Sequence, residues 1–139
     1  MSPAPRRALV ADDEDLTCWA LSRALTAEGF AVELAKTREE LIGRLIGAGY
    51  DLLVVSCSIG HARVCDLVDE VRRYRPTTQV IALVEPADGA GDRDADECAD
   101  AVRIEKPFCM NDLIAAARRL TQSAAPAGEA PVSEAKHQA

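Results

Sequence analysis

An α/β fold built on a doubly wound, five-stranded parallel sheet is predicted from the pattern of apolar residues. Short apolar runs alternate with longer helical patterns along the chain, as they do in consecutive βαβ units. Two of the runs, at 52–55 and 80–84, are apolar at every position, which is typical of strands covered on both faces. With 139 residues, of which 48% are apolar, the chain is long enough to bury one such core.

Strands and helices are predicted to alternate. Five strands are expected at residues 8–11, 30–35, 52–55, 80–84 and 101–104. Five helices are expected at residues 14–28, 37–48 and 62–74, in a short acidic segment before the last strand, and at 110–122. Gly29 is a stop signal for the first helix, and Pro76 follows the third. Thr37 and Glu40 have the spacing of a capping box at the start of the second helix.

One domain is expected over residues 6–122, after an N-terminal extension at residues 1–5. Residues 123–139 lack apolar periodicity and are rich in Ala, Pro and Ser, so they bury too little surface to offset their ordering entropy, and we expect a disordered tail. No window approaches the ~18 uninterrupted apolar residues of a membrane helix, and the N-terminus does not resemble a signal peptide. A cytoplasmic protein with no membrane partner is therefore expected.

The charge and the cysteines argue against several classes of function. The net charge of −7 opposes nonspecific binding to nucleic acid, because phosphate contacts need clustered Lys and Arg. The cysteines are odd in number, with neither a C-x-x-C pair nor zinc-type spacing. Reduced, mostly packed thiols are therefore expected, and not a disulfide framework or a structural metal. The five residues are Cys18, Cys57, Cys65, Cys98 and Cys109.

A run of four acidic residues, 12–15, follows the first predicted strand. Functional sites of open parallel sheets lie outside the carboxyl ends of the strands, so this run lies where a site is expected. Carboxylates crowded at one point repel one another unless a cation joins them, and Mg²⁺ prefers such oxygens. The same residues also suit the positive end of a helix dipole. On spacing alone, a metal site and an ordinary acidic helix start remain equally open.

A second signal lies after the fifth strand, where Lys106, Pro107 and Phe108 precede an amphipathic helix. Three motifs in this order resemble the receiver domain of bacterial response regulators. They are the first strand with its acid pair at 9–13, the third strand at 50–55 and the lysine corner at 104–108. The resemblance covers about residues 6 to 122. It implies a flavodoxin-like (βα)5 receiver fold and a role in two-component phosphorelay signalling.

The sequence departs from the family pattern at positions that carry or sense the phosphoryl group. Where the resemblance implies a phosphoacceptor aspartate at the end of the third strand, this chain has Ser56. The Ser or Thr that ends the family's fourth strand is Val84, and its aromatic switch residue is Arg103. We therefore predict a degenerate receiver site, which consists of Asp12, Asp13, Ser56, Val84, Arg103 and Lys106.

Metal binding and serine phosphorylation are both expected to be weak or absent. A complete site would hold three carboxylates and one ammonium, whereas Asp12, Asp13 and Lys106 have a formal charge of −1, so less repulsion remains for Mg²⁺ to relieve. Lys106 is expected to pair directly with one of the two aspartates. Ser56 needs a positioned base to act as a nucleophile, and His61, the one candidate, is predicted to be a solvated loop residue.

Two surface features are candidates for contact with a partner. On the first helix, the spacing predicts a core stripe of Thr17, Ala20, Leu21, Ala24 and Leu25. Leu16, Trp19 and Arg23 are left on another face as a candidate interaction surface, because aromatic residues and Arg are enriched at interface hot spots. Alternatively, Trp19 folds over the edge of its own domain. Seven acids between residues 85 and 100 form either a solvated face or an acidic surface for a basic protein.

The predicted function is protein binding. We expect an atypical single-domain response regulator that acts through phosphorylation-independent protein–protein interaction. Its partner is expected to be a histidine kinase, a downstream signalling protein or a second copy of the chain. The alternative is a stand-alone response regulator that is phosphorylated on a replacement residue. An enzyme is not expected, because the sequence shows no nucleophile with a base, no Gly-rich phosphate loop and no metal cluster.

Overall fold

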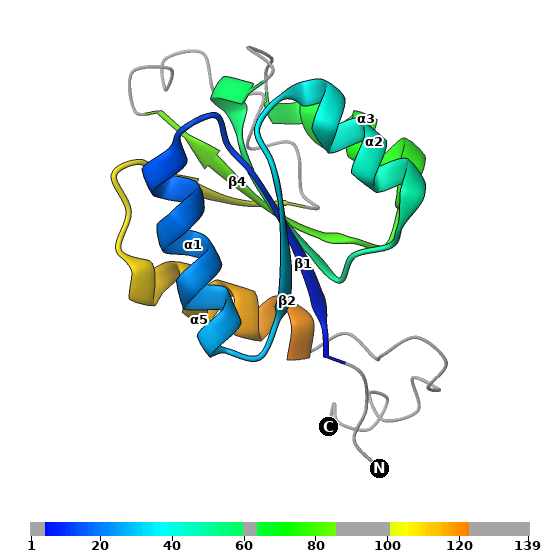
Figure 1. The fold of residues 1–139 in the computed structure, drawn as a ribbon. Helices are drawn as coiled ribbons and strands as arrows, with labels where there is room; N and C mark the ends of the chain where they lie inside the picture. The colour runs from blue at the N-terminus through cyan, green and yellow to red at the C-terminus, as the bar shows by residue number, and fades with distance from the viewer. Residues whose placement is uncertain (1–4, 60–63, 86–100, 123–139) are drawn as a thin grey trace, which may run out of the picture.

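A single parallel sheet organises the computed structural model, which describes residues 5–59, 64–85 and 101–122. The strands are β1 (Arg7–Ala11), β2 (Ala31–Ala35), β3 (Leu52–Ser56), β4 (Gln79–Val84) and β5 (Ala101–Glu105). They pair in the order β2-β1-β3-β4-β5, and every pair is parallel (Figure 1). The strand order reverses at β1, and a site is expected at such a point, beside the carboxyl ends of β1 and β3.

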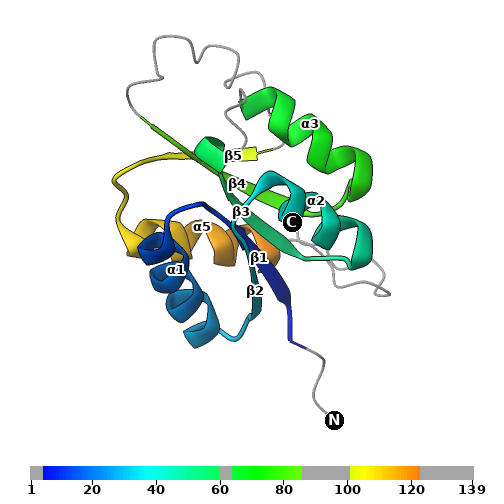
Figure 2. The same cartoon turned by 45° about the horizontal axis from the view of Figure 1, so that its top comes forward.

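Four helices and one 3-10 turn lie within the described residues. They are α1 (Asp15–Ala27), α2 (Arg38–Gly47), η1 (Cys57–Ile59), α3 (Val64–Tyr74) and α5 (Met110–Gln122). Figure 1 and Figure 2 both show α1 and α5 on one face of the sheet and α2 and α3 on the other. The predicted α/β fold is confirmed, and none of these helices is long and apolar enough to cross a membrane. The predicted short acidic helix, the predicted tail at 123–139 and His61 lie outside the described residues.

The two core layers follow from the alternation of side chains along a strand. In β3, Leu52 and Val54 pack with the α1 and α5 layer, while Leu53 and Val55 pack with the α2 and α3 layer. All four side chains are fully buried. The continuous apolar runs therefore do mark strands that are covered on both faces, as predicted.

The turn between α1 and β2 corrects the predicted start of the second strand. Gly29 has a φ of +99°, and the Phe30 N–H donates to the Leu25 carbonyl at 3.1 Å, which is a Schellman ending of the helix. The sequence predicts Phe30 as a strand residue because it is apolar. In the structure it belongs to this turn, and its side chain fills the core under α1.

The buried stripe of α1 is rotated relative to the predicted stripe. Cys18, Leu21 and Leu25 are buried, whereas Thr17, Ala20 and Ala24 are only half-buried, so the core positions predicted for these last three residues are wrong. A free cysteine packs as a small apolar residue, and Cys18 takes the core position. Thr17 Oγ1 instead donates to Glu14 Oε1 at 2.6 Å.

The start of α2 follows the predicted capping signal with one change of partner. Thr37 Oγ1 accepts a hydrogen bond from the Glu40 N–H at 3.1 Å, as in a capping box. The Glu40 carboxylate accepts from the Lys36 N–H at 2.7 Å, one residue earlier than the box predicts. The side chains of Thr37 and Glu40 thus each accept a hydrogen bond from a backbone N–H in the turn that connects β2 to α2.

Candidate functional site

The carboxyl ends of three strands bring predicted site residues together. Asp12 directly follows β1, and Ser56 is the last residue of β3, its neighbour in the sheet. Lys106 directly follows β5, and its N–H donates to the Val84 carbonyl at 2.8 Å, which continues the ladder with β4. The backbone therefore presents an acid, a hydroxyl and an ammonium at one edge of the sheet.

The side chain of Lys106 forms the predicted ion pair, and its partner is Asp12. The Nζ atom lies 3.1 Å from Asp12 Oδ2 and donates to Ser56 Oγ at 3.2 Å. Asp12 is fully buried, and the Lys106 side chain is 14% exposed. Glu85 Oε2, on a half-exposed side chain, lies 3.9 Å from the same nitrogen. The ammonium thus bridges a buried carboxylate and the end of β3.

The polar atoms of Asp12 are engaged by neighbouring groups. Its Oδ1 accepts from the Glu14 N–H at 3.0 Å, and its main-chain carbonyl accepts from the Cys18 thiol at 3.2 Å. Burial raises the pKa of the Asp12 carboxyl, and the Glu14 N–H and the Lys106 ammonium offset this rise only in part. Burial also raises the pKa of the Cys18 thiol, and the charge of Asp12 adds to this rise. Cys18 is thus a packed, neutral thiol.

A chain of hydroxyl groups links Lys106 to Asp13. Ser56 Oγ and Ser58 Oγ lie 2.8 Å apart, and Ser58 Oγ donates to Asp13 Oδ1 at 3.1 Å. The Ser58 N–H also donates to Ser56 Oγ at 3.3 Å, which is a turn closed by a serine side chain. Ser58 is a site residue that the family motifs do not reveal. The Ser-x-Ser spacing at the end of a buried strand is the one sequence signal that points to it.

Val84 and Arg103, the other two predicted site residues, differ in chemistry from the acids, the serine and the lysine described above. Val84 is buried in the α2 and α3 core layer, and its apolar side chain has no hydroxyl to offer. Arg103 lies in β5, where its guanidinium is 4.0 Å from Glu105 Oε2. Of the six predicted site residues, hydrogen bonds and an ion pair link four, with Ser58 as the bridge. These four are Asp12, Asp13, Ser56 and Lys106.

The carboxylates that could hold a metal ion are those of Asp12 and Asp13. Both oxygens of Asp12 already accept hydrogen bonds, and Asp13 Oδ1 accepts one from Ser58. Mg²⁺ prefers an octahedral set of oxygens and is usually held by one or two carboxylates. Within the described part of the chain, no group of three or more His, Cys, Asp or Glu side chains is arranged to hold a metal ion. The donors present fit a lysine-bridged network better than a divalent metal centre.

A pocket of about 520 Å³ opens beside this network, between the start of α1 and the segment after β5. Its lining consists of Glu14, Thr17, Glu85, Lys106, Pro107 and Phe108.

On the outer face of α1, Leu16 is 72% exposed and Trp19 is 59% exposed. The Arg23 guanidinium lies 5.2 Å from the centre of the Trp19 ring. Trp19 is therefore a surface residue whose ring stacks with the Arg23 side chain of the same helix.

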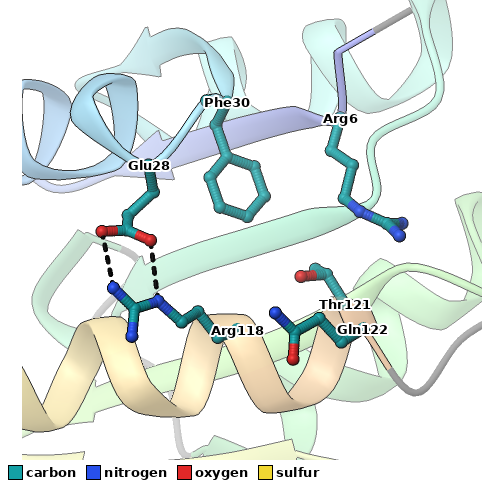
Figure 3. Close-up of a pocket in the computed structure, with 7 residues that line it drawn as sticks. Arg6, Glu28, Phe30, Arg118, Thr121 and Gln122 are labelled. Atoms are coloured by element: carbon teal, nitrogen blue, oxygen red, sulfur yellow. Dashed lines mark hydrogen bonds and ion pairs between the residues drawn. The ribbon is translucent and has the colours of Figure 1, made fainter. Parts of the chain in front are cut away.

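A smaller cavity, of about 230 Å³, lies at the opposite end of the sheet (Figure 3). Its lining includes Arg6, which precedes β1, and Gln122, which ends α5. Glu28 accepts two hydrogen bonds from Arg118, at 2.7 and 2.9 Å, and they lower the pKa of Glu28. This bidentate pair connects the end of α1 to α5, so it is a structural link between two helices.

Comparison with known proteins identifies relatives of this chain. The family model of the response regulator receiver domain matches residues 8–118. The transcriptional regulatory protein TcrA of Mycobacterium tuberculosis strain H37Rv is 33% identical over 119 residues, which are 84% of this chain and 46% of that protein. The acid tolerance regulatory protein ActR of Sinorhizobium medicae is 28% identical over 108 residues, 78% of this chain and 56% of that protein. The chain spans about half the length of these relatives.

Solved structures share the fold described above. A response regulator from Thermotoga maritima is 28% identical with a TM-score of 0.71, and the match covers 86% of this chain and 99% of that chain. A CheY-like receiver domain protein from Methanospirillum hungatei has the same TM-score of 0.71 at 21% identity, over 85% of this chain and 94% of that chain. The sheet order, the acid pair after β1 and the lysine after β5 agree with the family match. This chain belongs to the response regulator receiver domain family.

Proposed function

We propose that this receiver domain acts by binding other proteins without being phosphorylated. The observation that supports the proposal most strongly is the side chain at the end of β3, where Ser56 takes the place of the expected phosphoacceptor aspartate. A serine hydroxyl needs a base to become a nucleophile. Among the described residues, the groups that hydrogen-bond Ser56 Oγ are the Lys106 ammonium and the Ser58 N–H, which donate to it, and the Ser58 hydroxyl. None of these groups is a base that would remove its proton.

The proposed role is that of a binding module in two-component signalling, and not that of an enzyme. Response regulators interact with histidine kinases and with other proteins, so the partner that we propose is a histidine kinase or a downstream signalling protein. The acid pair and Lys106 also leave a second function to test, in which a replacement residue is phosphorylated. The Lys106–Asp12 ion pair favours the first function, because the lysine charge is paired with Asp12 and not with a phosphoacceptor.

Affinity capture from a lysate of the source organism tests this proposal with wild-type protein and Ser56→Ala. We expect Ser56→Ala to retain the partner of the wild type, because the binding needs no phosphoryl group and the alanine cannot accept one. The melting temperature of the variant serves as the control for folding. Loss of the partner from a folded Ser56→Ala protein would argue for a phosphorylated serine.

Trp19→Ala is expected to lose this partner while the domain stays folded. Trp19 is an exposed aromatic beside Leu16 and Arg23, and truncating a hot-spot aromatic costs about 2 kcal/mol, or roughly thirtyfold in affinity. Isothermal titration with the captured partner measures the affinity, and circular dichroism measures the fold. An unfolded Trp19→Ala protein would show instead that the indole stabilises its own domain.

Mg²⁺ is expected to add little stability to the wild-type protein. A ligand stabilises the fold by RT ln(1 + [L]/Kd), and in this site both oxygens of Asp12 and the Oδ1 atom of Asp13 already accept hydrogen bonds. The melting temperature should therefore change by less than roughly one degree in about 10 mM Mg²⁺. A rise of several degrees would mean that Mg²⁺ displaces Lys106 from Asp12.

A further inference from the structure

The pocket beside the ion pair has the size and chemistry of a specific binding site. Its volume of about 520 Å³ lies within the range of ~300–1,000 Å³ that is typical of pockets for small groups. Its lining combines the apolar residues Pro107 and half-buried Phe108, which packs against the α1 and α5 core layer, with the acidic residues Glu14 and Glu85. A ligand that matches this lining combines an apolar surface with a positive charge.

The charge of the pocket and of the acids behind it is strongly negative. The lining contributes Glu14, Glu85 and Lys106, and Asp12 and Asp13 lie behind the lysine. Four carboxylates against one ammonium leave a formal charge of −3. The Lys106 ammonium is the one cation of this group, and it is shared among the buried Asp12 at 3.1 Å, Ser56 at 3.2 Å and Glu85 at 3.9 Å. The carboxylates at the mouth therefore attract a second cation.

We propose that this pocket receives an arginine side chain of the partner protein. A guanidinium has flat faces that stack on an aromatic ring and an edge of N–H donors that pair with carboxylates, so it matches a lining that contains Phe108 together with Glu14 and Glu85. A lysine ammonium is more strongly hydrated and lacks the flat faces. This inference rests on the proposed function, and it specifies the chemistry of the partner.

An NMR titration with N-acetyl-arginine amide tests the pocket directly. We expect saturable shift changes at the backbone amides of Thr17, Glu85 and Lys106, with weaker effects from N-acetyl-lysine amide and none from the uncharged N-acetyl-citrulline amide. Glu85→Gln should weaken binding by about two- to fivefold, which is the range for one exposed ion pair. Asp69→Asn is the matched control, since it removes one exposed acid from α3, on the opposite face of the sheet.

Three results would overturn the arginine pocket. They are equal shifts from citrulline and arginine amides, shifts confined to other parts of the domain, and equal affinities for the wild type and Glu85→Gln. These failures are distinguishable from failure of the proposed function. If the probe does not bind but Ser56→Ala still captures the partner, only the arginine pocket is wrong. If Ser56→Ala loses the partner, the proposed function is wrong whatever the probe does.

Discussion

Lys106→Met is expected to lower the free energy of unfolding by about 3 kcal/mol, because removal of one partner leaves a buried charge without compensation. Asp12 is fully buried, and Lys106 Nζ is the cation at its Oδ2 atom. Methionine keeps the volume of the side chain and loses the charge. Urea denaturation of the wild type and the variant measures the loss when both are fitted with the same slope of the free energy of unfolding against urea concentration.

The loss is expected to depend on pH. The pKa of Asp12 is already raised in the folded wild type by burial, and removal of Lys106 raises it further. Between the unfolded and the folded pKa, the folded state then binds a proton that the unfolded state does not, so stability falls as pH rises through this interval. The variant should therefore be destabilised more at about pH 8 than at about pH 5.

The double variant Asp12→Asn/Lys106→Met provides the control for this prediction. Asparagine removes the charge that Lys106 compensates and keeps an acceptor for the Glu14 N–H. We expect it to recover most of the lost stability and to abolish the added pH dependence. A Lys106→Met protein that loses the same stability at both pH values, with no recovery in the double variant, would show that Lys106 stabilises the fold by packing alone.

Ser56→Asp is expected to strengthen Mg²⁺ binding relative to the wild type. The substitution gives β1 and β3 three carboxylates facing one lysine, and the repulsion among them favours a divalent cation. If the Kd is about 1 mM, then about 10 mM Mg²⁺ stabilises the variant by about 1.4 kcal/mol. Thermal unfolding with and without Mg²⁺ measures this gain. Ser56→Asn is the matched control, because it has a similar volume and no third charge.

A restored acceptor is not expected to restore switching. A phosphoryl group shifts a conformational equilibrium only through contacts that differ between the two states. Val84 has no hydroxyl to follow the phosphoryl group, and Arg103 is not an aromatic residue. NMR shift changes on treatment of Ser56→Asp with acetyl phosphate should therefore stay near Asp12, Asp13 and Lys106. Changes that spread through β4 and β5 would reveal a working switch.

Sequence patterns predict the sheet and its helices well, because a strand that is buried on both faces is apolar at every position and this is visible in the sequence. The runs at β3 and β4 are apolar at every position, and the helices carry their own end signals. The phase of α1 is harder to predict, because Thr17 and Cys18 both tolerate the core and packing decides between them. Strand ends shift by one residue because hydrogen bonding, and not apolarity, ends a ladder.

The site is predictable only in part. An acid after β1 and a lysine after β5 meet because parallel strands end at one edge, so the ion pair follows from topology. Which aspartate pairs with Lys106 does not follow, since Asp12 and Asp13 are neighbours that point in different directions. Ser58 joins the site through a turn closed by hydrogen bonds, and Glu85 joins the pocket from the end of β4. Neither relation leaves a repeating pattern in the sequence.

The intact mass of the wild-type protein after incubation with acetyl phosphate and Mg²⁺ tests the central claim most directly. A response regulator with the phosphoacceptor aspartate, treated in parallel, shows that the phosphodonor is active. We predict that the mass of this protein stays unchanged while the mass of the control increases by one phosphoryl group. A wild-type protein that gains a phosphoryl group at Ser56, Asp12 or Asp13 would contradict the claim that the domain works without phosphorylation.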